Sequence, residues 1–208
     1  MKILKRAPRP PLTATVDRSR VLSMWSSDMR NGVQPIEISI PFHKVRHLQP
    51  EDFVKVMLNE MGARGFVCGE NYRFGYKAVG DADLLRDLGE KYDIPVTVVK
   101  LVTTEEGGDS CISSSRITSL LSEGRMDLVA TMLGRKYRLV ADLTKGEAEG
   151  KSGHLLGKDC FLNMIPGPGS YPVLLPDTGQ EGTVQVGEEG LVIQGDFSRK
   201  QKLLEIDF

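Results

Sequence analysis

Gly65-Phe66-Val67-Cys68-Gly69-Glu70-Asn71-Tyr72-Arg73-Phe74-Gly75 is the stretch of the chain that decides its fold. It opens with a short apolar run between two glycines, which is typical of a buried strand. The polar and aromatic residues that follow predict a loop at the carboxyl end of that strand. In an open parallel sheet, ligands bind beyond the carboxyl ends of the strands. The stretch therefore predicts an α/β sheet that carries a ligand-binding loop.

Helices and strands alternate on both sides of this loop. Pro50 suits the first turn of a helix, where its missing N–H would be unpaired anyway, and residues 81–92 show a second helical period. The valine-rich residues 95–102 predict the next strand, and the alternation at residues 35–40 predicts another. Strands that alternate with helices at this spacing indicate a parallel sheet with helices on its faces.

Further helices are expected at both ends of this region. Residues 115–123 and 126–133 predict two helices, which Gly124 separates and Gly134 closes. Asp17 is placed to cap a helix near the start of the chain. The apolar side of that first helix is expected to carry Val21, Leu22, Met24 and Trp25.

The pattern changes after Gly134, because short strand candidates then alternate with glycine-rich turns. The candidates are residues 138–143, 155–162, 171–175, 182–186, 191–194 and 202–206. They predict a small antiparallel sheet or barrel. We therefore expect two domains. Residues 1–136 form an α/β domain, in which residues 1–16 are an extended tail or a replacement segment, and residues 137–208 form a β-rich domain.

Composition narrows the function. The formal net charge of −1 argues against general binding to nucleic acid or to an anionic membrane. No apolar run approaches the roughly 20 residues of a membrane span. Cys68, Cys111 and Cys160 lie far apart and form no C-x-x-C pair, so neither a zinc site nor a disulfide framework is expected. The sequence thus favours a soluble protein from a reducing compartment.

The first candidate site is the loop itself. An amide, aromatic rings and an arginine between glycines can stack on a flat ring and form hydrogen bonds with its edge. The candidate binding residues are Gly69, Asn71, Tyr72, Arg73, Phe74 and Gly75. The alternative is a β-turn capped by Asn71, with Phe74 as a core residue.

The second candidate site is Ile112-Ser113-Ser114-Ser115-Arg116-Ile117, at a predicted helix start. A helix N-terminus presents N–H donors and partial positive charge to an anion, and Arg116 adds a bidentate phosphate donor. We assign Ser114, Ser115 and Arg116 a catalytic role on phosphates, and Ile112 and Ser113 a binding role. The alternative is an ordinary N-cap with a surface arginine.

The two segments together carry a family resemblance. GENYRFG at residues 69–75, ISSSRI at 112–117 and LGRKYRL at 133–139 resemble, in this order, the motifs of the FAD synthetase (FMN adenylyltransferase) family. The run GENYRFGYKAVGDA at residues 69–82 is similar to the plant-type members, which are plastid enzymes. The resemblance covers residues 17–145 well and the remainder faintly.

The resemblance implies a Rossmann-like nucleotidylyltransferase domain followed by a riboflavin-kinase-like β domain. The implied reaction transfers AMP from ATP, with Mg²⁺, to FMN and gives FAD and pyrophosphate. The implied partners are these nucleotides, and the oligomeric state is left open. The implied compartment is the chloroplast, with the cytoplasm as the default alternative.

The chain departs from the family pattern at the phosphates. The family's histidine-x-glycine-histidine loop is absent, because His43, His47 and His154 lie in no such loop. Thr118 stands where the serine motif usually ends in arginine. We therefore expect an N-terminally incomplete domain with inefficient turnover. Two alternatives remain: a non-catalytic flavin- or nucleotide-binding protein, and an adenylyltransferase for another phosphorylated metabolite.

Two further expectations concern the ends of the chain. The family's kinase motif of proline, threonine, alanine and asparagine is lost around Leu156–Asn163, so kinase activity is not expected. The family's first strand is also missing. One hypothesis is that residues 3–4 or residues 12–16 pair in its place.

Overall fold

The fold is described from a computed structural model of the 208-residue chain. The structure describes residues 9–27, 29, 32–104, 110–145, 147–150, 153–194 and 202–208. The chain divides into two compact units, which are described separately. The small unit comprises residues 37–103, and the large unit combines residues 1–36 with residues 104–208. The predicted domain boundary at residue 136 remains a prediction.

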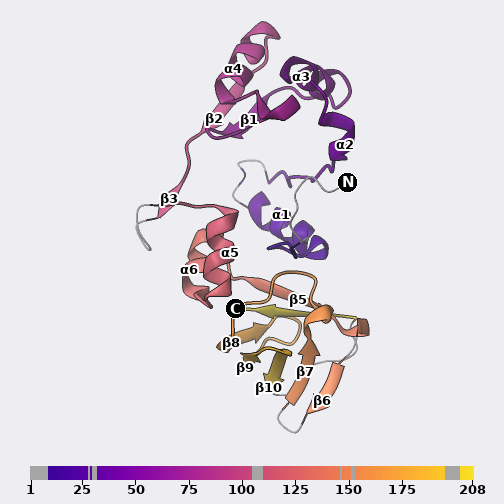
Figure 1. Cartoon of the computed structure of the whole chain (residues 1–208), viewed down its shortest axis with the longest axis vertical. Helices are drawn as coiled ribbons and strands as arrows, with labels where there is room; N and C mark the ends of the chain where they lie inside the picture. Colours follow the sequence, from indigo (N-terminus) through magenta and orange to yellow (C-terminus); the bar gives the residue numbers. More distant parts are fainter. Residues whose placement is uncertain are drawn as a thin grey trace. The chain divides into compact units, whose positions relative to one another are not determined.

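The small unit is built on two parallel strands (Figure 1). Strand β1 (Phe66–Gly69) pairs with β2 (Val96–Val99), from Phe66 opposite Val96 to Gly69 opposite Val99. The helices of this unit are α2 (Phe42–Val45), α3 (Pro50–Asn59) and α4 (Ala82–Lys91). Pro50 occupies the first turn of α3, as predicted. The buried hydrophobic residues of the core are Val54, Phe74, Leu85 and Leu88.

The strand predicted at residues 35–40 is wrong. This segment precedes α2 and forms no strand. Ile36, Ile38 and Ile40 are 80%, 59% and 37% exposed. Alternating apolar residues produce a strand only where a neighbouring strand supplies hydrogen bonds and a buried face. Residues 35–40 have neither in the structure, and so remain extended and exposed.

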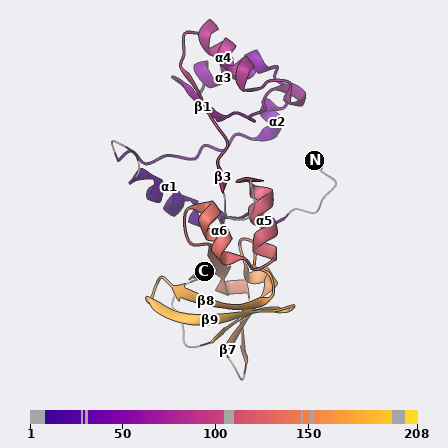
Figure 2. The same ribbon diagram turned by 90° about the vertical axis from the view of Figure 1, so that its left-hand side faces the viewer.

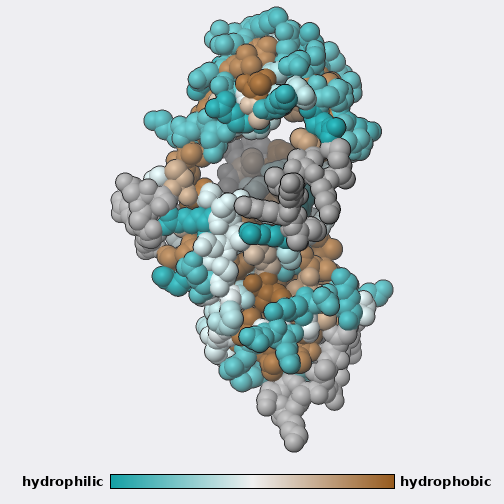
Figure 3. Space-filling model, viewed as in Figure 1, coloured by the Kyte–Doolittle hydropathy of each residue, from teal (hydrophilic) through white to brown (hydrophobic). Residues whose placement is uncertain are grey.

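Strand β1 is also less buried than its sequence suggests. Val67 is 74% exposed, and Val99 on β2 is 48% exposed. Hydrophobic surface is visible among hydrophilic surface in each unit in Figure 3. Within the described residues β1 pairs with β2 only, which leaves apolar side chains of this short sheet in contact with solvent.

Among its described residues, the large unit contains three α-helices and two short strands before its main sheet. Helices α5 (Ser114–Ser122) and α6 (Met126–Leu133) lie where the sequence predicts them, and Gly134 closes α6 with a φ of 65°. Strand β3 (Thr103–Thr104), which spans the division between the units, pairs with β4 (Ser110–Cys111). The third helix is α1 (Arg18–Ser26).

Helix α1 differs from its prediction in two respects. Met24 and Trp25 are 42% and 52% exposed, whereas Val21 is buried. Asp17 precedes the helix but accepts no hydrogen bond from its backbone. Instead, Nε and Nη2 of Arg20 donate to the two carboxylate oxygens of Asp17 at 2.6 and 2.7 Å. The carboxylate is therefore satisfied by a side chain one turn later.

The main sheet confirms the predicted β-rich region. Seven strands run in the spatial order β5-β11-β8-β9-β10-β7-β6, and their pairings are antiparallel. Figure 2 shows the long β8–β9 pair. The strands are β5 (Arg138–Asp142), β6 (Glu147–Gly150), β7 (Gly153–Gly157), β8 (Gly169–Leu175), β9 (Gln180–Val186), β10 (Gly190–Gln194) and β11 (Leu203–Asp207). Strand β6 was not predicted.

Helices α5 and α6 share one core with this sheet. They lie on one side of it (Figures 1 and 2), and Ile117, Leu121 and Val129 belong to the same buried cluster as the strand residues. At Gly167, the backbone N–H donates to the carbonyl of Leu121 at 2.8 Å. A Cβ there would lie 2.0 Å from a backbone oxygen, so this close approach requires glycine. The serine motif therefore stands on a helix anchored to the β-rich region.

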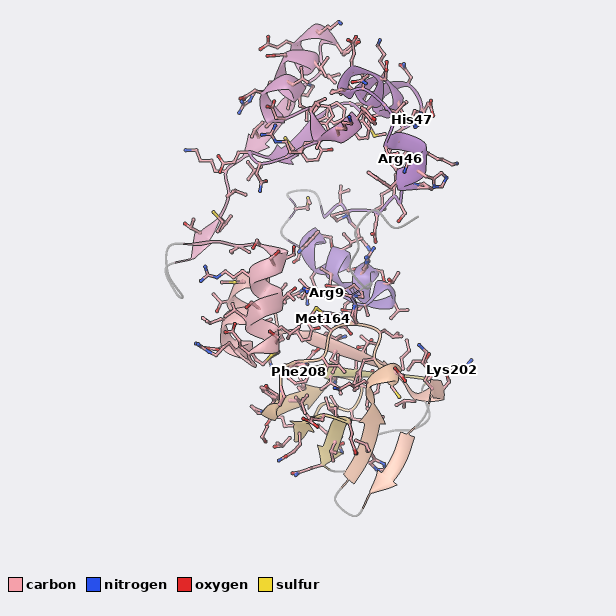
Figure 4. The ribbon with its side chains drawn as sticks, in the orientation of Figure 1. Arg9, Arg46, His47, Met164, Lys202 and Phe208 are labelled. Atoms are coloured by element: carbon pink, nitrogen blue, oxygen red, sulfur yellow. The ribbon has the colours of Figure 1, made fainter. Side chains whose placement is uncertain are left out.

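Residues 11–14 pack against the rest of the large unit, to which they belong. The carbonyl of Pro11 accepts a hydrogen bond from the backbone N–H of Met164 (labelled in Figure 4) at 3.0 Å, and Ala14 is fully buried. Leu12 packs against the large core. The hypothesis that residues 12–16 replace a strand of the parallel sheet is wrong, because these residues form no strand and Thr15–Asp17 are a 3-10 helix. Residues 3–4 lie outside the described residues.

Asn163 holds this docked segment. Its side-chain oxygen accepts from the N–H of Val140 at 2.9 Å, and its amide nitrogen donates to the carbonyls of Arg138 at 2.8 Å and Leu12 at 3.2 Å. The same nitrogen lies 3.0 Å from the hydroxyl of Tyr137. Burial raises the pKa of that hydroxyl. The side chain of Asn163 is thus committed to backbone and core contacts.

Candidate functional site

The candidate loop begins where β1 and β2 end side by side. The N–H of Glu70 donates to the carbonyl of Val99 at 2.9 Å. The carboxylate of Glu70 accepts from the N–H of Leu101 at 2.9 Å. Glu70 therefore joins the carboxyl ends of the two strands and fixes the start of the loop.

Two polar side chains of the loop reach solvent. Asn71 is exposed in a turn that the hydrogen bond from the N–H of Tyr72 to the carbonyl of Gly69 closes at 3.0 Å. The side chain of Arg73 is 60% exposed, and Nη1 lies 3.4 Å from the carboxylate of Asp81. Such an exposed pair contributes little to stability. The guanidinium of Arg73 is therefore available to an anionic ligand at small cost.

The aromatic side chains of the loop pack against the core of the small unit. The ring of Tyr72 stacks on that of Phe74, with centroids 5.6 Å apart and planes 10° apart. The ring of Phe53, on α3, also packs against that of Phe74, with ring centroids 5.8 Å apart. Phe74 is only 5% exposed, and burial raises the pKa of the half-buried Tyr72. The alternative interpretation is thus correct in making Phe74 a core residue.

The end of the loop is tightly constrained. The N–H groups of Phe74 and Gly80 each donate to the other's carbonyl, at 3.1 and 3.0 Å. Gly75 has a φ of 74°, and a Cβ on it would lie 2.8 Å from Cγ of Pro50. Asp81 then caps α4 by accepting from the N–H of Leu84 at 3.0 Å.

The serine motif forms the N-terminus of α5. Ser113 is the N-cap, and its hydroxyl oxygen accepts from the N–H of Arg116 at 3.3 Å. The side chains of Ser113, Ser114 and Ser115 are exposed, and that of Arg116 is half-buried. Ile112 packs against the large core. Exposed hydroxyls around a helix N-terminus suit the binding of a phosphate.

Each motif lies in its own unit: the loop in the small unit and the helix tip in the large unit. That both act on one ligand remains a prediction. Sequence reasoning gave no structural role to Glu70 or Asp81. Asp81 carries a recognisable signal, since an acidic residue directly precedes a helical period. Glu70 carries none, because its partners are backbone groups from the next strand.

The other residues singled out from the sequence lie elsewhere. His43 lies in α2, and Arg46 and His47 directly follow that helix on the surface of the small unit (Figure 4). His154 lies in β7. Asn163 is 1% exposed and is occupied by its structural contacts.

The fold is that of a mixed α/β protein, in which a parallel pair of strands with its helices is followed by an antiparallel sheet. The chain belongs to the FAD synthetase family, whose model matches residues 8–116 of the 208. This match covers the whole Gly69–Gly75 loop and the serine motif as far as Arg116.

Relatives of known function resemble a larger part of the chain. "FAD synthetase 1, chloroplastic" of Arabidopsis thaliana is 36% identical over 82% of this chain and 52% of its own length. "FAD synthetase 2, chloroplastic" of the same plant is 33% identical over 100% of this chain and 62% of its own length. The chain therefore spans between half and two thirds of these curated relatives.

A solved structure resembles nearly the whole chain. This structure, "Crystal Structure of Macrolide-efflux Protein from Streptococcus pneumoniae", matches over 99% of this chain and 70% of its own, with a TM-score of 0.70. At 20% identity, this likeness supports the fold alone. In the part of the chain that the structure describes, no helix is long and apolar enough to cross a bilayer.

Proposed function

We propose that the chain acts as an FMN adenylyltransferase, which transfers AMP from Mg-ATP to FMN. A phosphate oxygen of FMN attacks the α-phosphorus of ATP, the bond to the β-phosphate oxygen breaks, and FAD and pyrophosphate leave. The observation that carries the proposal is the family match across residues 8–116, which spans the loop and the serine motif as far as Arg116. The names of the two Arabidopsis relatives point to the same reaction.

The residues of the helix tip would bind the phosphates. Ser114 and Ser115 present exposed hydroxyls beside the N–H groups of the first turn, and Arg116 supplies a permanent positive charge. Ser113 holds the first turn in shape, because its hydroxyl caps the N–H of Arg116. The chemistry forms no covalent enzyme intermediate, so the protein's task is to align the two phosphates and to neutralise developing charge.

The loop would bind a ring or base. Asn71 offers an amide that can both donate and accept, and Arg73 offers a planar cation. Gly69 and Gly75 bracket the loop, while Tyr72 and Phe74 hold it against the core. Mg²⁺ would enter as part of the Mg-ATP substrate. Among the described residues no cluster of three or more His, Cys, Asp or Glu could hold a metal.

The departures from the family motif are the reason to test a second candidate, a flavin- or nucleotide-binding protein with little turnover. Thr118 lies in α5 at the position of the family's arginine. Removal of one transition-state donor typically costs about 10²–10³ in rate. We therefore expect FAD formation by this chain to be slow. An adenylyltransferase for another phosphorylated metabolite is the third candidate.

The test combines turnover with binding. FAD formed from FMN and Mg-ATP is measured by chromatography, and the affinities for FMN, FAD and ATP by titration calorimetry. Arg116→Ala should weaken ATP or FAD binding about tenfold or more, because it removes a charged hydrogen bond. Asn71→Ala should weaken FMN or FAD binding about two- to tenfold.

Arg125→Ala is the matched control for Arg116→Ala. Arg125 is an exposed arginine between α5 and α6 that pairs with Asp127 at 3.6 Å, outside both motifs. Its replacement should leave all three affinities unchanged. Binding without turnover would support the second candidate, and a wild-type chain that binds neither flavin nor ATP would refute both.

The compartment is part of the same proposal. Both Arabidopsis relatives are named as chloroplastic, so we propose the plastid as the site of action. A fusion of the full-length gene product to a fluorescent protein in leaf cells should coincide with chlorophyll fluorescence. A diffuse cytoplasmic signal would contradict the proposal.

A further inference from the structure

A strained turn follows the binding loop directly. Lys77 and Ala78 have φ values of 54° and 57°, although neither is glycine. For a residue with a Cβ, the left-handed region is disfavoured by roughly 5- to 30-fold. Among the described residues outside glycine, Asp93 alone shares this conformation, with a φ of 53°. Aspartate adopts it more readily than lysine or alanine.

The base of the turn is fixed on both sides. The N–H of Tyr76 donates to the carbonyl of Leu48 at 2.7 Å. Phe74 and Gly80 pair through two backbone hydrogen bonds, and Gly75 is pressed against Pro50. A change in the tip therefore has to occur between residues 76 and 79, because the residues that flank it are held by the core of the small unit.

The tip itself is weakly held and exposed. The N–H of Ala78 donates to the carbonyl of Gly75 at 3.0 Å. The N–H of Val79 donates to the carbonyl of Tyr76 at 3.4 Å, which is long for a hydrogen bond. Tyr76 and Val79 are 42% and 58% exposed. The ammonium of Lys77 lies 5.3 Å from the centroid of the Tyr76 ring. An aromatic ring and a cation are thus placed together on solvent-exposed, strained backbone.

We propose that residues 76–79 are a lid on the ligand of the Gly69–Gly75 loop. On binding of a phosphorylated ring compound, the turn leaves the left-handed conformation, Tyr76 covers the ring and Lys77 moves from Tyr76 to the phosphate. Strained backbone persists where the surrounding structure over-determines it, and it gathers at ligand clamps and switches. Release of the strain then contributes to affinity. The proposal rests on the proposed function, since it uses the same flavin ligand.

The test is the replacement of Ala78 by glycine. Glycine adopts a positive φ without cost, so the free state is stabilised. Ala78→Gly should raise the thermal midpoint of unfolding by about 4–8 °C. It should weaken FMN binding about fivefold, because the strain that binding would release is gone. FMN itself is the probe, and its dissociation constant is measured by calorimetry.

Asp93→Gly is the matched control. It removes the third left-handed residue from the same unit, but Asp93 follows α4 and lies outside the loop. It should also raise the midpoint of unfolding while leaving the FMN dissociation constant within twofold. Amide exchange at residues 78 and 79 should slow when FMN is added to the wild-type chain.

The outcomes separate the two proposals. If the wild-type chain binds FMN and Ala78→Gly binds it equally well, the lid is wrong and the proposed function stands. Equal weakening in Ala78→Gly and Asp93→Gly would also refute the lid, since the effect would then be general. If the wild-type chain binds no FMN, the proposed function fails and the lid falls with it.

Discussion

The two units carry their motifs on very different amounts of buried structure. Among the described residues, the small unit buries four hydrophobic residues in one cluster beneath a two-stranded sheet. The large unit buries eighteen in one cluster on a seven-stranded sheet. Local unfolding is easiest where buried apolar contacts are few. We therefore expect the Gly69–Gly75 loop to stand on the less stable unit, and the N-terminus of α5 on the more stable one.

The largest effect on the free energy of unfolding should come from Leu121→Ala, which removes a side chain from the core of the large unit. Leu121 is fully buried between α5 and the sheet. The substitution should lower the free energy of unfolding by about 2–5 kcal/mol, through lost burial and a cavity. Urea denaturation measures this loss. Leu120→Ala, at a half-buried neighbour on the same helix, should cost clearly less.

Leu85→Ala tests the other side of the comparison. Leu85 is 2% exposed, but it belongs to the four-residue cluster of the small unit. The loss should lie near the lower end of the same range, about 2 kcal/mol, because a small core can relax around the cavity. If Leu85→Ala lowered the free energy of unfolding as much as Leu121→Ala does, the core of the small unit would not relax more easily than that of the large unit.

Asn163→Ala should destabilise the large unit in a different way, by leaving buried polar groups unpaired. It removes the acceptor for the N–H of Val140 and the donor for the carbonyls of Arg138 and Leu12. Each buried group left unpaired costs about 1–3 kcal/mol. Amide exchange should accelerate in α1 and at Met164 as the first segment loosens. Gln185→Ala, at an exposed position of β9, should change neither exchange nor the free energy of unfolding.

The smallest effect concerns pH and the small unit. Hydrogen bonds from Lys91, Tyr92 and Lys55 lower the pKa of Glu51 from 4.5 to about 2. Because the pKa of Glu51 is lower in the folded state than in the unfolded state, its carboxylate stabilises the fold fully only above pH 4.5. This stabilisation is lost as the pH falls from 4.5 towards 2. The pairs are exposed, so the effect should be modest.

Acid titration of the thermal midpoint measures this effect, with Glu51→Gln as the comparison. The wild-type chain should lose its advantage over Glu51→Gln between pH 4.5 and 2. A difference between the two that stays constant through this range would contradict the assignment. Glu90→Gln, on the surface of α4, is the control for loss of a carboxylate as such.

Local signals predicted most of the elements. Pro50 at the start of α3, Gly134 after α6 and the valines of β2 each act through their own backbone preferences, and the structure confirms them. Residues 35–40 were wrongly predicted because alternation shows that a segment could form a strand, not that a partner strand is present. Strand β6 was missed because its residues, Glu147–Gly150, lack the apolar alternation of its neighbours.

The candidate site was predictable in position but not in detail. The strand before Gly69 and the helix after Ser113 mark where a ligand could bind. The burial of Phe74 follows from its contact with Phe53, and the bonds of Glu70 follow from the end of β2. The left-handed Lys77 and Ala78 contradict local preference, so sequence patterns give no sign of them.

The contact between Leu12 and Asn163 also sets an order of events during synthesis. The two residues are 151 positions apart, so the first segment has no docking partner until most of the chain has been made. At about 5–20 residues per second, the delay is roughly 8–30 s. During that interval the segment around Leu12 must stay soluble without its docking partner, which its sparse apolar content allows.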